Sequence, residues 1–425
     1  MSTEHDWFVG IDWATEAHEV CILDAAGAVV EQRSVAHTGD GLRALADRLV
    51  RLGDGRTERV AVGIEVPHGA VVETLLERGF TVFSLNPKQL DRFRDRFSPA
   101  GAKDDRRDAR VLADSLRTDR HCFRRLTVEP AQTILLRESV RTEEELKEES
   151  GRLTNRLRDL LLRYYPQILV LSPAADEPWV WTLVASAPTP DKGRRLRPAT
   201  IEKILRRHHI RRVSSQQVHD ALQATPLHVA PGTVEAVSAH IGVLIPQLQL
   251  VHRQLGQAQH AIKTLLDAMA EPAEPAADDC AEREREHRDV EILRSAPGVG
   301  RVTVATMLAQ ASRALNDRDY HALRAQAGLA PVTKASGKAC RVEMRRACDV
   351  RLRNAFYHMA RVATICDAAT RSYYNDLKKR GHSHGRALRS VADRLLRILC
   401  AMLRDGTCYD PSRCSYASSA PAKAA

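Results

Sequence analysis

Short apolar runs alternate with helical patterns through the first 90 residues of the chain. Three apolar runs separated by short turns predict strands joined by tight hairpins. A helix, a buried strand, a second helix and a fifth strand follow, and Pro87 closes the last strand. In order, the predicted elements are the strands WFVGID, HEVCILD and AVVEQRSV, a helix around 40–53, the strand ERVAVGIEV, a helix near 69–79 and the strand FTVFSLN.

This order of elements predicts the fold class of the N-terminal domain. Three strands followed by helix, strand, helix and strand is the order of the ribonuclease H-like and RuvC-type nuclease fold. We therefore predict an α/β domain of this type over residues 1–125. Its first and fourth strands are expected to lie side by side and parallel, so that their carboxyl ends meet at one edge of the sheet.

Helical patterns dominate after residue 126. Residues 131–165 are highly charged, with apolar positions at three- and four-residue steps. A later segment has an unbroken 4-3-4-3 spacing, which keeps one apolar seam on one side of a helix, as a coiled coil or a bundle requires. A helical hairpin inside one chain gives the same pattern, so both arrangements stay open. The seam consists of Leu244, Leu248, Val251, Leu255, Ala258, Ile262, Leu265 and Met269.

The composition of the remaining segments suggests three further regions. Residues 126–288 form a helical or coiled-coil region that ends in a Pro/Ala-rich and then charged linker near 271–289. A compact all-α C-terminal domain is predicted over residues 289–408. The tail 409–425 is predicted to be disordered.

The net charge of the chain predicts a polyanionic partner. A net charge of +10 and a pI near 9.3 favour nucleic acid, although an ordinary basic cytosolic protein would show the same excess. No apolar run approaches the length of a membrane span and the N-terminus carries no signal pattern. We therefore expect a cytoplasmic protein, nucleoid-associated when bound to DNA, without a membrane partner. The nine cysteines include no CxxC pair, so neither a zinc site nor a disulfide framework is predicted.

Four carboxylates are candidates for a catalytic site. Asp12 ends the first predicted strand and Glu65 ends the fourth, so both should emerge at the same edge of the sheet. Asp105 and Asp108 are three residues apart in the helical segment KDDRRDARVLADSL, and we expect both to face the sheet rather than solvent. Asp104 is one position off this pair and is expected to cap the helix.

Carboxylates that converge on one point repel each other unless cations are bound. Mg²⁺ takes oxygen ligands, and two ions about 3.5–4 Å apart can activate an attacking oxygen and stabilise a leaving oxygen in phosphodiester chemistry. Mn²⁺ would fit the same ligands. Each of these residues alone is typical of a turn or a helix cap. Together, a strand-end Asp, a strand-end Glu and a helical D-x-x-D pair favour a metal-dependent site.

Two loops in the C-terminal half carry further candidates. The motif Pro-Gly-Val-Gly lies between two helical patterns, and Gly298 and Gly300 would let backbone N–H groups approach a phosphate; a plain helix–helix turn explains the motif equally well. In GLAPVTKASGK, Ser336 precedes a glycine and lies between Lys334 and Lys338. A small nucleophile beside phosphate-holding cations suits a covalent site, although a Ser-Gly pair is more often a turn. Nearby cations that could neutralise phosphates are Arg341, Arg345 and Arg346.

These parts, in this order and spacing, resemble the insertion-sequence-110 family of DEDD transposases, which includes a 1111 branch. The resemblance covers nearly the whole chain. FVGIDWATEAHEVCILD is similar to the family's first strand and hairpin, VAVGIEV to its glutamate strand, and AKDDRRDARVLADSLR to its K-x-D-x-x-D-A helix. LRSAPGVGRVTVATMLA and AGLAPVTKASGK are similar to the start and the serine motif of its C-terminal transposase domain.

The resemblance implies a role for each candidate. Asp12, Glu65, Asp105 and Asp108 would hold magnesium, and Ser336 would be the nucleophile of an RNA-guided recombinase. A noncoding RNA from the element would pair with both donor and target DNA. The resemblance also implies homodimers and homotetramers in which the carboxylates of one subunit complete the serine site of another. The family often has two serines before the glycine, whereas Ala335 precedes Ser336 here and leaves Ser336 the single candidate.

We therefore predict an insertion-sequence transposase that cleaves DNA and exchanges strands. Metal ions would polarise the scissile phosphate, and Ser336 would form a phosphoserine link with it. One alternative is a hydrolytic RuvC-like Holliday-junction endonuclease, in which the same carboxylates activate water and Ser336 is structural. A second alternative is a non-catalytic nucleic-acid-binding protein, whose activities would survive Asp105→Ala.

Overall fold

The chain divides into two compact units, Met1–Pro130 (unit 1) and Ala131–Ala425 (unit 2). The computed structural model describes residues 5–97, 104–270, 289–337 and 339–414. Most of the predicted linker near 271–289 and the end of the predicted tail lie outside these residues. The predicted division of the second unit at residue 288 stays a prediction.

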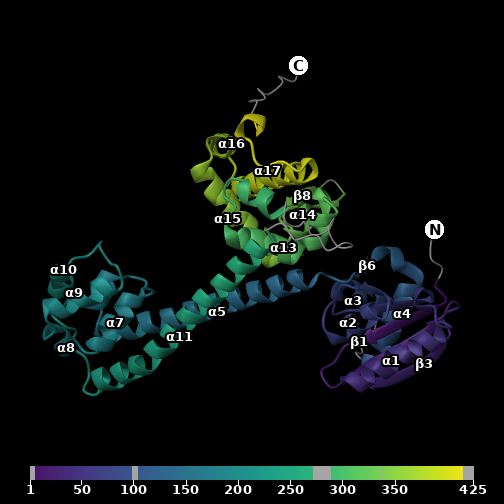
Figure 1. The fold of residues 1–425 in the computed structure, drawn as a ribbon, viewed down its shortest axis with the longest axis horizontal. Helices are drawn as coiled ribbons and strands as arrows, with labels where there is room; N and C mark the ends of the chain where they lie inside the picture. Colours follow the sequence, from purple (N-terminus) through teal and green to yellow (C-terminus); the bar gives the residue numbers. More distant parts are fainter. Residues whose placement is uncertain (1–4, 98–103, 271–288, 338, 415–425) are drawn as a thin grey trace. The chain divides into compact units, whose positions relative to one another are not determined.

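Unit 1 is built on a mixed sheet (Figure 1). Its strand order is β3-β2-β1-β4-β5-β6. β1 pairs in parallel with β4, and β4 with β5, whereas β2, β3 and β6 are antiparallel to their neighbours. The predicted order of strands and helices is confirmed, and it is consistent with a ribonuclease H-like fold. The strands are β1 Trp7–Asp12, β2 Ala17–Asp24, β3 Val29–Ala36, β4 Val60–Ile64, β5 Thr81–Ser84 and β6 Arg124–Arg125.

Helices cover both faces of this sheet. Val9 and Ile11 point to the face covered by α1 and α2, and Phe8 points to the face covered by α3 and α4. The sequence did not predict α3, which begins at Pro87 with Asn86 as its N-cap. The helices are α1 Gly39–Leu52, α2 Ala70–Glu77, α3 Pro87–Asp95 and α4 Asp105–Asp119, with the 3₁₀ turns η1 Thr57–Arg59 and η2 Arg120–Cys122.

A glycine in β1 brings α4 unusually close to the sheet. A Cβ added to Gly10 would lie 2.0 Å from the carbonyl oxygen of Ala109 and 2.5 Å from the backbone nitrogen of Ala113. Any larger residue at this position would therefore push the helix away from the strand. This contact holds the first turn of α4 beside the carboxyl end of β1.

Two long helices, α5 Ala131–Tyr164 and α11 Thr233–Ala268, pack along each other in unit 2 (Figure 1). Leu244 and Leu248 of α11 are buried in one core with Leu153 and Leu157 of α5. Much of the predicted apolar seam is thus buried within one chain, as in the helical hairpin that the spacing left open, and an intermolecular coiled coil is not confirmed. The helices between them are α6 Gln167–Leu171, α7 Pro178–Ser186, α8 Pro190–Arg194, α9 Pro198–Arg207 and α10 Ser215–Gln223.

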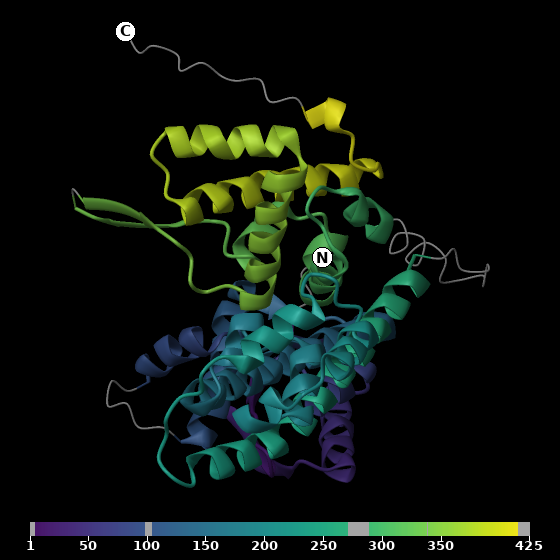
Figure 2. The same ribbon diagram turned by 90° about the vertical axis from the view of Figure 1, so that its left-hand side faces the viewer.

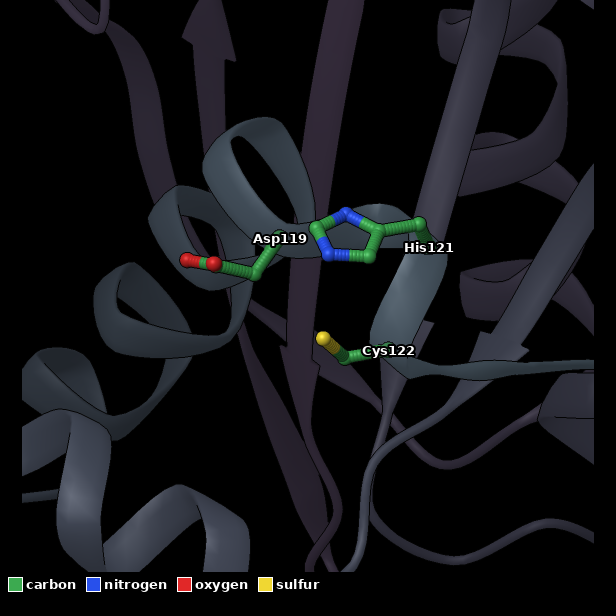
Figure 3. Close-up of side chains that lie close together, drawn as sticks. All are labelled: Asp119, His121 and Cys122. Atoms are coloured by element: carbon green, nitrogen blue, oxygen red, sulfur yellow. The ribbon is translucent and has the colours of Figure 1, made fainter.

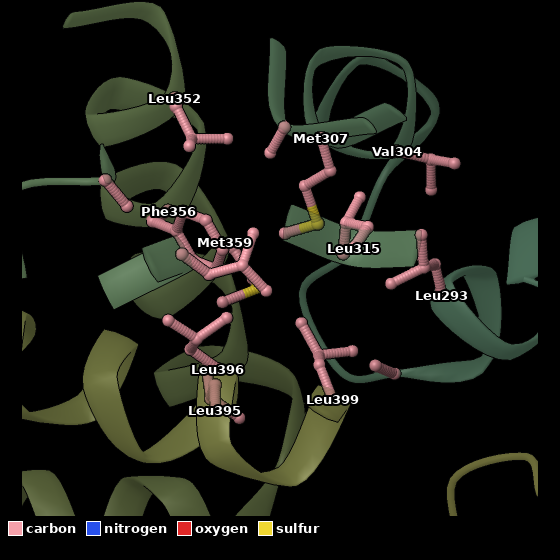
Figure 4. Close-up of a cluster of buried hydrophobic side chains, with 14 of the residues drawn as sticks. Leu293, Val304, Met307, Leu315, Leu352, Phe356, Met359, Leu395, Leu396 and Leu399 are labelled. Carbon is pink, nitrogen blue, oxygen red and sulfur yellow. The ribbon is translucent and has the colours of Figure 1, made fainter. Parts of the chain in front are cut away.

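The C-terminal part of unit 2 is mostly helical. Figure 4 shows its core, where Met307 of α13 lies near Phe356 and Met359 of α15 and near Leu396 of α17. The prediction of an all-α domain was wrong in one respect, because a two-stranded hairpin interrupts the helices. The elements are a helical segment 289–295, α13 Arg301–Asn316, α14 Tyr320–Gln326, β7 Val332–Ser336, β8 Ala339–Glu343, α15 Val350–Cys366, α16 Ala368–Lys379, α17 His384–Asp405 and the 3₁₀ turn η3 Pro411–Cys414.

Two further expectations from the sequence need correction: the disorder of the whole tail 409–425, and the statement that no apolar run approaches the length of a membrane span. The tail is ordered at its start, because the backbone N–H of Tyr409 donates to Ser295 Oγ at 2.8 Å and residues 411–414 form η3. Among the described helices, α11 is long and apolar enough by composition to cross a membrane. One side of that helix is instead used to pack against α5.

Candidate active site

Three carboxylates are neighbours at one edge of the unit 1 sheet. β1 and β4 are parallel with Ile11 opposite Ile64, so Asp12 at the end of β1 is level with Glu65, which directly follows β4. On the other side of β1, the ladder with β2 puts Asp12 directly opposite Glu19. Residues opposite each other in an antiparallel pair project to the same face, with Cβ atoms about 4.5–5.5 Å apart.

These carboxylates belong to the face of the sheet that α4 covers. Side chains two residues apart in a strand share a face. Gly10, Gly63 and Cys21, each two residues from one of the three carboxylates, lie against α4 or in the core that α4 shares with the sheet. The helix therefore brings its own first turn to the same edge.

Asp108 is the carboxylate that α4 contributes to this edge of the sheet, and it is buried. Its side chain is 1% exposed. Asp104 is the N-cap, as predicted, and accepts a hydrogen bond from the backbone N–H of Arg106 at 3.4 Å. The expectation that Asp105 is also turned away from solvent was wrong, since Asp105 is exposed in the first turn. Two residues three positions apart in a helix lie about 60° apart around its axis. At the end of a helix, one of them can therefore be buried while the other is exposed.

Two arginines compensate part of this negative charge. Arg94 of α3 donates from Nε and Nη2 to the two oxygens of Asp108 at 2.5 and 2.7 Å. The hydrogen bond that Arg94 donates to Asp108 is the main cause that raises the pKa of Arg94, and the charge of Glu65 adds to it. Arg106 Nε lies 3.5 Å from Glu19 Oε2, an oxygen that is buried without a hydrogen-bond partner.

The sequence prediction missed Glu19 and Arg94. Finding Glu19 needed the register of the β1–β2 ladder, in which six residues lie between it and its partner Asp12. Arg94 gave no such signal, since α3 itself was not predicted. With both included, the site has more carboxylates than guanidinium groups, and its donors are all oxygen atoms, which are the ligands that Mg²⁺ and Mn²⁺ take.

Ser336 is exposed at the tip of the β7–β8 hairpin in unit 2. It pairs with Ala339 across the turn, and Gly337 takes a positive φ of 55°. The Ser-Gly pair therefore does form a turn, as the structural alternative expected, and the turn leaves the serine accessible. Figure 2 shows the hairpin extending away from the neighbouring helices, and its strands are exposed along almost their whole length. Lys338 lies outside the described residues.

The predicted phosphate-binding cations around Ser336 differ in their surroundings. Lys334 Nζ pairs with Glu343 Oε2 of the opposite strand at 2.7 Å. Arg345 Nε donates to the carbonyl of Ala330 at 3.4 Å. Arg341 and Arg346 are exposed.

The two glycines of the Pro-Gly-Val-Gly motif have different roles in the structure. A Cβ on Gly298 would lie 2.3 Å from the carbonyl oxygen of Met359, so this glycine allows close packing against α15. The phosphate contact expected of the Gly298 backbone stays a prediction. Gly300 is the N-cap of α13 and is exposed, with no atom within 4 Å of an added Cβ.

A second set of metal-binding residue types lies at the end of α4. The donor atoms of Asp119, His121 and Cys122 are within 4.8 Å of one another, and Figure 3 shows the three side chains around the turn. The carboxylate of Asp119 is already engaged, because Thr118 Oγ1 donates to it at 2.6 Å and Arg96 lies 3.4 Å away. The expectation of no zinc site is not tested by this set, and we assign no ion to it.

Comparisons with known proteins cover both units. The family model of the DEDD transposase domain of the IS110 type, described as a transposase, matches residues 9–166. The model of the transposase IS116/IS110/IS902 family matches residues 290–375. The first match includes every carboxylate of the site, and the second includes Ser336.

Full-length relatives agree with these matches. The chain is 30% identical to the mini-circle putative transposase for IS117 of Streptomyces coelicolor, with 96% of each chain covered. It is 30% identical to the insertion element IS110 43.6 kDa protein of the same organism, with 95% of each covered. It is also 49% identical over 213 residues to the putative transposase y4uE of Sinorhizobium fredii, of which it spans 59%. The chain therefore belongs to the IS110 family of transposases, enzymes that act on DNA.

Proposed function

We propose that this transposase cleaves DNA and exchanges strands through a covalent link to Ser336, with divalent ions held by Asp12, Glu65, Asp105 and Asp108. The observation that carries the metal site is the row formed by Asp12 and its neighbours on the face that α4 covers. A bound Mg²⁺ or Mn²⁺ ion would supply polarisation of the scissile phosphate. Glu19 adds a further carboxylate to this row.

The accessible position of Ser336 supports its proposed role as the nucleophile. Ser336 Oγ gives its proton to solvent and forms a bond to phosphorus. The bond between phosphorus and one sugar oxygen breaks, and that oxygen takes up a proton. In the second half, a sugar hydroxyl of the new partner strand gives its proton to solvent and forms a bond to phosphorus. The bond between phosphorus and Ser336 Oγ breaks, and the serine oxygen takes up a proton. The phosphodiester energy is conserved in the link, so rejoining needs no external energy source.

The proposal includes a guide RNA and an assembly of several subunits. The net charge of +10 is suited to binding nucleic-acid backbones, and backbone contacts carry no sequence information by themselves. A noncoding RNA from the element would supply the sequence by pairing with donor and target DNA. Homodimers or homotetramers would let carboxylates and Ser336 from different copies act on one phosphate.

Trapping of covalent protein–DNA adducts tests the serine mechanism. The gene is expressed with its native flanking DNA, because a missing RNA would imitate a dead enzyme. Wild type is compared with Ser336→Ala, with Asp105→Ala and with the control Thr333→Ala on the same exposed strand. We expect adducts in wild type and the control and none in the other two.

The hydrolytic endonuclease predicts a different result. Cleavage would then persist without any adduct in Ser336→Ala, and would be lost in Asp105→Ala. Asp105 is suited to this comparison because it is exposed, so its replacement leaves the buried contacts of α4 intact. Retention of all activity in Asp105→Ala would instead favour a protein without this metal chemistry.

A further inference from the structure

Asp108 carries a charge in a place that water hardly reaches. Its side chain is 1% exposed, between α4 and the sheet. A buried carboxylate is stable only when a cation or several donors compensate its charge. The group that does so here is the guanidinium of Arg94, through two hydrogen bonds of 2.5 and 2.7 Å.

In this pairing the guanidinium of Arg94 occupies the same oxygen atoms of Asp108 that a metal ion would bind. The fork of Nε and Nη2 engages one oxygen each, which is the strongest arrangement of an arginine on a carboxylate. A Mg²⁺ ion needs an oxygen at about 2.0–2.1 Å. The fork and the ion cannot occupy the same edge of Asp108 together.

We propose that Arg94 is the resident cation of the carboxylate site in the metal-free protein, and that a divalent ion displaces it from Asp108. Arg94 is then a positioning residue that keeps Asp108 in place and lowers the affinity of the site for metal. This inference rests on the proposed function, because it takes Asp108 as a metal ligand.

The surroundings of Arg94 give it a second partner after displacement. Its Nη1 already hydrogen-bonds to Asp91, one turn earlier in α3. The side chain of Asp91 is 65% exposed, so this pair lies toward solvent. The charge of Glu65 also acts on Arg94, which places the guanidinium in the field of two of the four candidate ligands. A swing from Asp108 toward Asp91 would keep Arg94 paired.

Calorimetric titration of the full-length protein with Mn²⁺ tests the exchange. We expect Arg94→Ala to bind Mn²⁺ more tightly than wild type by about tenfold, because the ion no longer competes with the guanidinium. Arg92→Ala is the matched control, since Arg92 is an exposed arginine of the same helix. We expect its affinity to equal that of wild type. Arg94→Lys keeps the charge without the fork and should fall between the two.

Equal or weaker binding of Mn²⁺ by Arg94→Ala would overturn the inference, because Arg94 would then remain on Asp108 or assist the ion. Asp12→Asn separates this failure from that of the proposed function. If wild type and Asp12→Asn bind Mn²⁺ equally, the metal site itself is wrong. If Asp12→Asn loses binding while Arg94→Ala gains none, the metal site stands and the exchange does not.

A second measurement on wild type serves if Arg94→Ala fails to fold. Phenylglyoxal modifies accessible guanidinium groups, and mass spectrometry follows the rate at each arginine. We expect saturating Mn²⁺ to speed the modification of Arg94, whose side chain is 23% exposed when paired with Asp108, and to leave Arg92 unchanged. An unchanged or slower rate at Arg94 would contradict displacement.

Discussion

Asp12 and Glu19 lie directly opposite each other in the β1–β2 ladder, on the face of the sheet that α4 covers. Glu65 is the neighbour of Asp12 on the other side. The hairpin thus brings Glu19 to the site, a carboxylate that is not among the four expected from the family pattern. Glu19 Oε2 is buried without a hydrogen-bond partner, and the cation that pairs with it is Arg106, whose Nε lies 3.5 Å away.

The neutral variant Glu19→Gln tests whether this carboxylate belongs to the metal site. We expect Mn²⁺ binding to weaken by roughly tenfold, about 1.4 kcal/mol, because one negative charge near the ion is lost. Calorimetric titration measures the change. Glu16→Gln, in the exposed turn of the same hairpin, should bind like wild type. Wild-type affinity in Glu19→Gln would mean that Glu19 has no part in holding the ion.

Gly10→Ala tests the close approach of α4 to β1. The added methyl group would lie 2.0 Å from the carbonyl oxygen of Ala109, so the helix must shift. We expect a loss of about 1–3 kcal/mol in the free energy of unfolding, as for overpacked cores, together with weaker Mn²⁺ binding. Thermal unfolding measures the first effect. Gly39→Ala, at an open position of α1, should change stability by much less, and equal effects of the two substitutions would refute the argument.

Alanine substitutions at the two glycines before α13 should distinguish a role in packing from a role in phosphate binding. Gly298→Ala places a Cβ 2.3 Å from the carbonyl oxygen of Met359 at a φ of 76°, so we expect a lower melting temperature. Gly300→Ala meets no atom within 4 Å and should fold like wild type. Differential scanning calorimetry distinguishes them. A stable Gly298→Ala protein with impaired DNA binding would instead indicate that this glycine acts in phosphate binding and not in packing.

Thiol reactivity should follow burial in unit 2. Burial raises the pKa of Cys400 to about 11, and the thiolate is the reactive form. At about pH 8 we expect iodoacetamide to alkylate Cys400 at least roughly tenfold more slowly than exposed Cys340 of the β7–β8 hairpin. The rate at Cys400 should rise with pH up to its pKa, since more thiolate forms. Mass spectrometry of the alkylated peptides gives both rates, and equal rates would show that the core around α17 opens readily.

The strand order of unit 1 could be predicted because each strand is a separate apolar run with clear turns between runs. The positions of Asp12 and Glu65 followed from that order alone, since parallel neighbours end at one edge. β6 has two residues, too few for any pattern to mark. α3 was hidden because Pro87 reads equally as the end of a strand and as the first residue of a helix.

Other parts of the site depend on tertiary contacts that periodicity does not encode. The helical spacing treats Asp105 and Asp108 alike, but Asp108 is buried and paired with Arg94, whereas Asp105 is exposed. The pairing of Arg94 with Asp108 joins α4 to α3, a helix that the sequence did not predict. The apolar spacing of α11 was recognised in the sequence, but the spacing does not say which helix covers it. In the structure α5 of the same chain packs against it.

The covalent link is the central claim, and its position on the chain can be measured directly. Adducts isolated from cells are digested with nuclease and protease, and the peptide that keeps a nucleotide is identified by mass spectrometry. We predict that the nucleotide is attached to Ser336. A nucleotide on any other residue, or DNA cleavage that leaves no modified peptide, would contradict the account.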